Sequence, residues 1–230
     1  MASFVLVHGS GQHAGCWSRV GDLLKARGHA VAAPDLPKKA PSWGLRDHAA
    51  EIARSIPGPD AVVVGHSASG SFLPLVPEVR GCSALVFLAA VIPEPGKSVR
   101  EQFGEDPSMF SQAWIAAGKR WFEASEMESL AREFLFHDCD DETLAWALGT
   151  MGMMDTRGLV TEPAPFTKWP SVRVASIVAT DDRTLSPGWI RRTSLRVLGK
   201  EAIGIKAGHC PQVSRPEETA RILEEIARSM

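Results

Sequence analysis

Short apolar runs alternate with segments of helical spacing through the first 92 residues. The runs at 4–8, 30–33, 60–64 and 83–89 each end at or close to a glycine or proline, as buried strands commonly do. Between the first two runs, Trp17, Val20 and Leu24 recur at helical spacing, and Gly28 follows where a helix would end. Uniformly apolar strands separated by helices predict a parallel sheet that is covered on both faces.

This rhythm stops between residues 94 and 169, where the pattern predicts helices and no strand. The apolar positions 127, 130, 131, 134 and 135 lie on one face of a helix. Strand patterns resume at 172–178 and 202–206, and a last helix is expected to begin at Pro216. We therefore expect an α/β core of residues 1–92 and 170–230, with a mostly parallel six-stranded sheet flanked by helices, and a helical cap of residues 93–169.

Composition narrows the class of protein without assigning a function. The chain has 230 residues, of which 44% are hydrophobic and 23% charged, which suits one globular core. The net charge of −2 and the lack of a long basic run argue against a nucleic-acid partner. We expect no membrane helix, no secretory signal and, from four cysteines without a CxxC pair, free thiols. A cytoplasmic monomer or homodimer is the expectation.

The segment Gly65-His66-Ser67-Ala68-Ser69-Gly70 directly follows the third predicted strand and approximates the G-x-S-x-G nucleophile elbow. This turn is sharp, so the residues two before and two after the serine must be small. Gly65 meets that requirement, whereas Ser69 replaces the usual glycine. We interpret Ser67 as the nucleophile and expect a helix from about Ala68. The non-catalytic alternative for this segment is a strand that ends in an ordinary Gly/Ser-rich turn.

A serine nucleophile needs an adjacent base. In proteins with this kind of nucleophile elbow, the histidine base comes last in the chain, after the acid. Of the seven histidines, His209 alone follows both Ser67 and the predicted cap. Asp181 and Asp182 follow the strand predicted at 172–178. We favour Asp182 as the acid because the stretch 183–187 suits the loop after it, and Asp181 would then cap or hydrogen-bond locally. Asp181 stays the alternative acid.

Acyl transfer also requires donors for the oxygen that gains negative charge in the transition state. One is expected from the backbone N–H of Ala68, the residue after the nucleophile. The second is expected from the loop after the first strand, where we assign the backbone N–H of Ser10. Gly9 would allow the close approach of this loop, and His8 would support it.

These residues resemble the α/β hydrolases, in the branch that holds plant methyl-ester esterases, hydroxynitrile lyases and many bacterial esterases. The segments that carry the resemblance are 5–9, Trp17, 28–36, 65–70, 85–88 with Pro93, 136–139, 169–170, 180–187 and 208–209. The resemblance implies a helical cap and a serine mechanism with no cofactor and no metal. Hydroxynitrile lyases of this branch carry a lysine after the histidine, whereas this chain has Cys210, which disfavours cyanohydrin cleavage.

The function we expect is cleavage of a carboxylic ester, thioester or lactone of a small, largely apolar molecule through an acyl-enzyme. We expect some of the cap's apolar residues to line the pocket and most to pack the cap: Phe103, Met109, Phe110, Trp114, Trp121, Phe122, Met127, Phe134, Trp146, Met151, Met153 and Met154. An anionic substrate is disfavoured because no arginine pair stands near the motifs.

Three other functions stay open. The first is a lyase or cyclase of the same fold that acts on a natural-product intermediate. The second is a dinucleotide-binding reductase, with residues 9–15 as the glycine-rich loop and Asp35 as the ribose-binding acid, although the glycine spacing departs from G-x-G-x-x-G. The third is a binding protein that has lost catalysis. His13 and Cys16 are too few ligands for a metal site.

Overall fold

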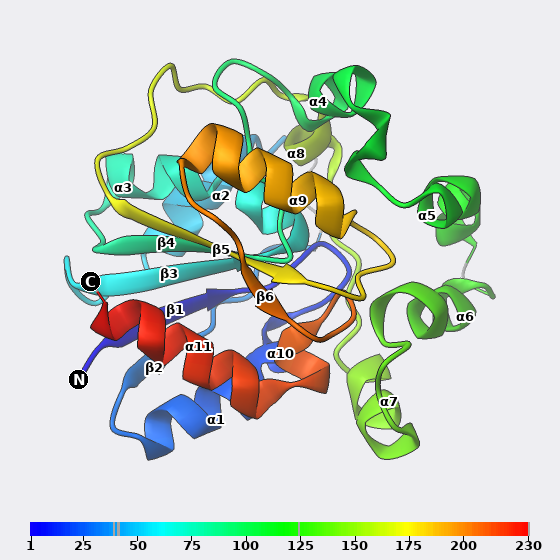
Figure 1. The fold of residues 1–230 in the computed structure, drawn as a ribbon, viewed down its shortest axis with the longest axis horizontal. Coiled ribbons are helices and arrows are strands. Elements are labelled where there is room, and N and C mark those ends of the chain that lie inside the picture. The colour runs from blue at the N-terminus through cyan, green and yellow to red at the C-terminus, as the bar shows by residue number, and fades with distance from the viewer. Residues whose placement is uncertain (39, 41, 124, 230) are drawn as a thin grey trace.

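The computed structural model describes residues 1–38, 40, 42–123 and 125–229, and its centre is one six-stranded sheet (Figure 1). The strands are β1 (Ser3–Val7), β2 (Ala30–Ala32), β3 (Ala61–His66), β4 (Ala84–Leu88), β5 (Arg173–Ala179) and β6 (Ile203–Ile205). Their order in the sheet is β2-β1-β3-β4-β5-β6, and every neighbouring pair is parallel. The predicted fold class is confirmed, with a sheet that is parallel throughout.

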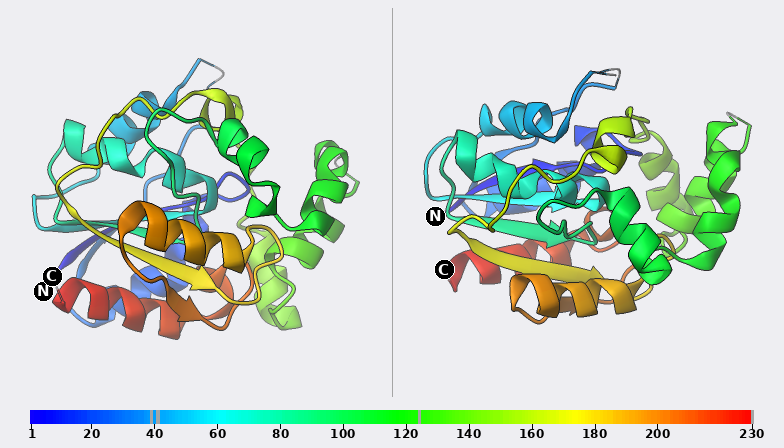
Figure 2. Two further views of the ribbon diagram at one scale, coloured as in Figure 1. Left: turned by 45° about the horizontal axis from the view of Figure 1, so that its top comes forward. Right: turned by 90° about the horizontal axis from the view of Figure 1, so that it is seen from above.

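Helices cover both faces of this sheet, as Figure 2 shows. One face holds α1 (Ser18–Ala26) and α11 (Pro216–Arg228), and the other holds α2 (Leu45–Ala53), α3 (Val76–Val79) and α9 (Pro187–Thr193). Successive side chains of a strand point to opposite faces. Accordingly, Phe4 and Leu6 pack with α1 and α11, while Val5 and Val7 pack with α2 and α9. α11 begins at Pro216, as predicted.

Between β4 and β5 the chain forms helical elements, and the middle ones lie beyond the carboxyl ends of the strands (Figure 1). They are α4 (Val99–Glu105), η4 (Pro107–Met109), α5 (Gln112–Ala117), η5 (Gly118–Phe122), α6 (Met127–Leu130), the π-helical η6 (Ala131–Leu135), α7 (Asp141–Leu148) and α8 (Arg157–Thr161). We use "cap" for residues 93–169 from here on. The division into two domains stays a prediction. Both chain termini lie at the opposite end of the sheet from α5, α6 and α7.

The remaining elements are short. They are η1 (Ala14–Trp17), η2 (Ser67–Ser71), η3 (Leu73–Leu75), the π-helical η7 (Ser194–Leu198) and α10 (Pro211–Ser214). The prediction of a helix from about Ala68 was wrong in helix type. Two short 3₁₀ segments come first, and the α-helical turn of α3 follows them. Pro74 and Pro77 lie in this stretch and have no N–H to continue a helical hydrogen-bond ladder.

The parallel sheet brings separate parts of the chain to one edge. β3 ends at His66, β5 ends at Ala179 and β6 ends at Ile205, so the loops after these strands share the carboxyl edge of the sheet. That edge is where open α/β sheets carry their ligand sites. The loop after β1 reaches the same edge, and the cap lies next to all of them.

Candidate active site

Ser67 lies at the tip of a strained turn directly after β3. Its φ of 56° is in the left-handed region, which a non-glycine residue occupies only when its surroundings enforce it. A Cβ on Gly65 would lie 2.7 Å from Cδ1 of Leu73, and a Cβ on Gly70 would lie 2.0 Å from the carbonyl oxygen of Val91. Both positions therefore need a residue without a side chain, and the turn has the form of the predicted elbow.

The structure brings Ser67, His209 and Asp182 together in one hydrogen-bonded chain. Nε2 of His209 lies 2.9 Å from Oγ of Ser67, and Nδ1 of His209 lies 2.8 Å from Oδ2 of Asp182. The side chains of His209 and Asp182 are 3% and 0% exposed. A carboxylate accepts only, so Nδ1 carries its proton toward Asp182 and leaves Nε2 free to accept from the serine hydroxyl.

Asp182 and Asp181 have different environments. Oδ1 of Asp182 accepts hydrogen bonds from the backbone N–H groups of Thr184 at 2.7 Å and Leu185 at 3.1 Å. Asp181 is exposed, and its backbone N–H donates to the carbonyl of Ala207 at 3.0 Å. The geometry therefore places Asp182, and not its neighbour, at the imidazole.

His66 supports the His209 loop, a role that the sequence analysis did not assign. Its Nε2 lies 2.9 Å from the carbonyl oxygen of His209, which can only accept, so this nitrogen carries the proton. Burial, reinforced by the neighbouring His209 imidazole, holds the pKa of His66 well below its usual value of 6.5. A neutral His66 thus anchors the backbone of His209 across the turn. The sequence feature that could have indicated this role was the position of His66 between Gly65 and Ser67.

The loop after β1 packs directly against the elbow. A Cβ on Gly9 would lie 2.9 Å from Cβ of Ser67, which explains the glycine at this position. Oγ of the buried Ser69 donates to the carbonyl of His8 at 2.5 Å. The serine that replaces the usual glycine of the elbow thereby fixes the loop that follows β1. In the sequence alone, Ser69 was only a departure from the motif.

The two predicted oxyanion donors belong to the residues that follow the Gly9–Ser67 contact in the chain, Ser10 and Ala68. The N–H of Ala68 is in the first turn of η2, where helical amides have no partner inside the helix. Ser10 lines the cavity next to Ser67, and its carbonyl accepts from the N–H of Met154 at 2.9 Å. The N–H of Gly152 donates to Gly11 at 3.0 Å, so the cap segment after α7 holds the loop from its outer side.

The glycine-rich loop at residues 9–15 is used to build this site. Its Gly9 packs on Ser67, and the carboxylate of Asp35 accepts from the N–H of Ala14 at 2.6 Å. The residues that suggested dinucleotide binding thus serve the Ser67 turn and the local loop.

A cavity of about 780 Å³ opens beside Ser67 and His209, between the core loops and the cap. Its apolar lining comes from Trp114, Trp121, Met127, Leu135, Met153 and Met154, with Cys210 next to His209. Lys38, Asp155 and Arg157 also line it, and the Arg157 guanidinium donates to both carboxylate oxygens of Asp155, with a shortest distance of 2.6 Å. The cavity suits a largely apolar molecule.

The other apolar cap residues that were considered contribute to packing. Met109 and Phe134 are buried in the core clusters, and Phe103 packs edge-on against Phe110 with ring centroids 5.5 Å apart. Met151 and Trp146 pack against the same cluster as Phe134. The side chain of Phe122 lies outside the described part of the structure.

The described residues hold neither a metal cluster nor a membrane-spanning helix. Within residues 1–38, 40, 42–123 and 125–229, no group of three or more His, Cys, Asp or Glu side chains could hold a metal ion. In the same part of the chain, no helix is long and apolar enough to cross a membrane.

A six-stranded parallel sheet with a serine, a histidine and a carboxylate at its carboxyl edge defines the fold class of the α/β hydrolases. The sequence model described as "Alpha/beta hydrolase family" matches residues 4–222. The chain therefore belongs to the α/β hydrolase family, and the resemblance found in the sequence is confirmed.

Similar proteins are known from plants. A protein named "Probable esterase PIR7A" from Oryza sativa subsp. indica is 30% identical, over 97% of this chain and 96% of its own length. "Norfluorocurarine synthase 2" from Strychnos sp is 26% identical, over 99% of this chain and 96% of its own length. The crystal structure of polyneuridine aldehyde esterase superposes with a TM-score of 0.76 at 23% identity, covering 99% of both chains, which supports the fold.

Proposed function

We propose that this α/β hydrolase cleaves a carboxylic ester of a small, largely apolar molecule through an acyl-enzyme on Ser67. Membership of the family and the esterase relatives identify the protein as a hydrolase that acts on ester bonds. The single observation that carries the residue assignment is the hydrogen-bonded chain from Ser67 through His209 to Asp182. Thioesters and lactones have the same reacting carbonyl and stay within the proposal.

In the proposed reaction, Oγ of Ser67 attacks the substrate carbonyl while Nε2 of His209 takes its proton. The N–H groups of Ser10 and Ala68 donate to the oxygen that becomes negative. His209 then gives the proton to the leaving alcohol, and water activated by the same imidazole releases the acid. Asp182 orients the imidazole throughout, because its oxygens accept from His209 and from two backbone amides.

The substrate is inferred from the walls of the cavity. Two tryptophans and three methionines supply much of its apolar lining, and methionine side chains adapt to varied shapes. The guanidinium of Arg157 is already paired with Asp155, which argues against a dedicated site for a strongly anionic substrate. A small neutral ester with an aliphatic or aromatic group fits this surface.

A lyase or synthase reaction at the same residues is the second candidate. A relative that is 26% identical over nearly the whole chain is named a synthase, and fold alone does not decide the reaction. Comparing ester turnover with the release of a non-hydrolytic product from the same molecule separates the two candidates.

The test of the proposed function is a fluorophosphonate label, mapped by mass spectrometry, together with short p-nitrophenyl esters. We expect the label on Ser67, and we expect Ser67→Ala to lower ester turnover by roughly 10⁴-fold or more. A Ser129→Ala variant, at an exposed serine of α6, serves as the matched control. Unchanged turnover in Ser67→Ala, or a label at another residue, would exclude the assignment.

Three finer statements belong to the same proposal. We place the protein in the cytoplasm, which the four free cysteines support. We expect a monomer or a homodimer with a small-molecule ester as its partner. The cap, residues 93–169, is expected to act as a unit that covers the site.

A further inference from the structure

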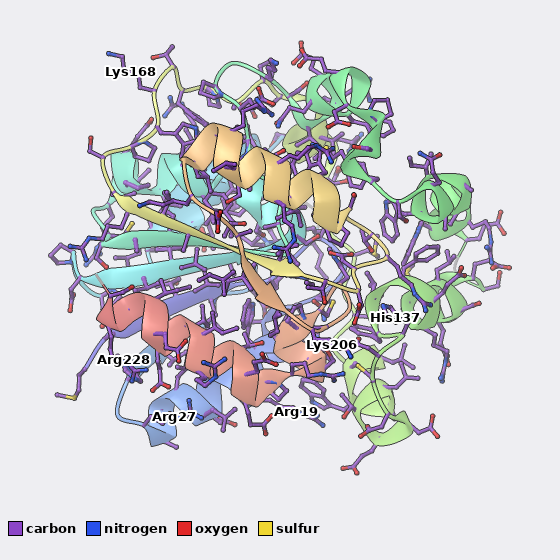
Figure 3. The ribbon with its side chains drawn as sticks, in the orientation of Figure 1. Arg19, Arg27, His137, Lys168, Lys206 and Arg228 are labelled. Atoms are coloured by element: carbon purple, nitrogen blue, oxygen red, sulfur yellow. The ribbon has the colours of Figure 1, made fainter. Side chains whose placement is uncertain are left out.

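The cap segment at residues 136–139 lies between the two loops that carry Asp182 and His209. It joins η6 to α7, and both His137 and Asp138 are half-buried there. Figure 3 labels His137 where the cap helices meet the core, in the region where Lys206 follows β6. The mechanism above gives this segment no task.

His137 contacts the loop of the acid. Its Nε2 lies 2.9 Å from the carbonyl oxygen of Asp181, the residue before Asp182, and therefore donates to it. The N–H of Asp181 donates to the carbonyl of Ala207 at 3.0 Å. Asp181 is thus held on one side by the cap and on the other by the loop after β6.

Asp138 contacts the loop of the base. Its Oδ2 accepts from the N–H of Gly208 at 2.8 Å, and Gly208 directly precedes His209. A Cβ on Gly208 would lie 2.6 Å from Oδ1 of Asp138 and 2.9 Å from Nε2 of His137, so both side chains pack against this glycine. The guanidinium of Arg215 lies 3.9 Å from the same carboxylate.

We propose that His137 and Asp138 are positioning residues. By binding both loops to the cap, they fix the position of the Asp182 loop relative to the His209 loop. This inference rests on the proposed function of Ser67, His209 and Asp182. Two adjacent residues of one segment hold one loop each, so the distance between acid and base depends on the docked cap. A misplacement of about 1 Å at a reacting group can lower a rate by about 10²-fold.

The experiment compares Asp138→Ala with Asp138→Asn, using a short p-nitrophenyl ester. The alanine removes the acceptor of the Gly208 amide, and we expect kcat to fall by about 10- to 100-fold while KM changes little. The asparagine keeps an oxygen that can accept from Gly208, so we expect it to recover most of the loss. Glu142→Gln is the matched control, because it neutralises an exposed carboxylate of the same cap and should leave kcat unchanged.

His137→Ala and Gly208→Ala test the same contact from its other members. His137→Ala should lower kcat in the same way, and Gly208→Ala should do so because its Cβ would collide with both cap side chains. Thermal unfolding of each variant, and kcat measured well below the melting temperature, separate positioning from stability. A lower melting temperature with an unchanged kcat in the Asp138 and His137 variants would overturn the inference.

The fluorophosphonate experiment distinguishes failure of this inference from failure of the proposed function. If the label reaches Ser67 in the wild type and at the same rate in Asp138→Ala, the positioning role is wrong and the function of Ser67 stands. If Ser67→Ala retains wild-type turnover, the proposed function itself is wrong. A slower label in Asp138→Ala, restored in Asp138→Asn, supports both.

Discussion

The carboxylate of Asp182 contacts the imidazole of His209 with one oxygen and the backbone of its own loop with the other. Oδ2 lies 2.8 Å from Nδ1 of His209, while Oδ1 accepts from two backbone N–H groups. Because both oxygens have fixed partners, the carboxylate cannot turn away from the ring. The imidazole is thereby held with Nε2 toward Ser67.

Asp182→Asn is expected to lower kcat for ester hydrolysis by about 10⁴-fold, because the amide favours the wrong tautomer of His209. Asp181→Asn is the matched control, since its carboxylate is exposed and its contacts are made by its backbone. Steady-state turnover of a p-nitrophenyl ester measures both variants. Equal losses in the two variants would contradict the choice of Asp182.

Gly70→Ala is expected to destabilise the protein by about 3 kcal/mol, because its Cβ would lie 2.0 Å from the carbonyl oxygen of Val91. The N–H of Val91 donates to the carbonyl of Ser67, so the turn would have to move. Gly104→Ala is the control, since this exposed position within α4 has open space and should gain roughly 0.5–1 kcal/mol. Urea unfolding gives both values, and similar midpoints for the two variants would refute the prediction.

Ser69→Ala is expected to lower the free energy of unfolding by about 1–3 kcal/mol, because the buried carbonyl of His8 loses its donor. Since that carbonyl belongs to the loop of Ser10, we also expect kcat to fall while KM changes little. Ser129→Ala, at an exposed serine, should shift stability by less than about 0.5 kcal/mol. An unfolding midpoint of Ser69→Ala equal to that of the wild type would show that the contact is not needed.

The strands and the elbow were predictable because their signals are local. The buried parts of the longer strands are apolar runs, as at Phe4–Val7, Ala84–Leu88 and Ile177–Ala179, and the turn at Ser67 needs small residues at fixed offsets. The order of the chain also indicated that His209 would follow the acid. What the pattern could not determine was the helix type after Ser67, where two prolines interrupt the hydrogen-bond ladder.

The supports of the site were not predictable, because they depend on contacts between distant segments. His66 reaches the backbone of His209, and Ser69 reaches His8, through tertiary packing that no spacing rule describes. Similarly, residues 136–139 carried part of the family resemblance, but the partners of His137 and Asp138 lie in loops 44 and 70 residues away. The choice between Asp181 and Asp182 needed the hydrogen bond to His209.

Mandelonitrile is expected to give no cyanide release above the uncatalysed background. Hydroxynitrile lyases of the resembling branch place a lysine after the histidine, whereas Cys210 is buried here, with its thiol 3.7 Å from Oε1 of Gln12. Burial raises the pKa of the Cys210 thiol well above its usual value, so the group stays neutral and offers no positive charge to cyanide. A cyanide electrode measures the release, with Ser67→Ala as the background control. Rapid release that needs Ser67 would favour the lyase reaction.

Stability is expected to fall as the pH is lowered from about 6.5 to 5, because burial lowers the pKa of His8, His48 and His66 in the folded state. The unfolded chain then binds more protons than the folded one, so their contribution is complete above the unfolded pKa of about 6.5 and is lost below it. His48→Gln removes one of these three imidazoles, at a position that is not among the proposed catalytic residues. We expect this variant to flatten the slope of unfolding free energy by at most about 1.4 kcal/mol per pH unit. Urea unfolding at several pH values checks this, and identical slopes for variant and wild type would contradict a neutral, buried His48.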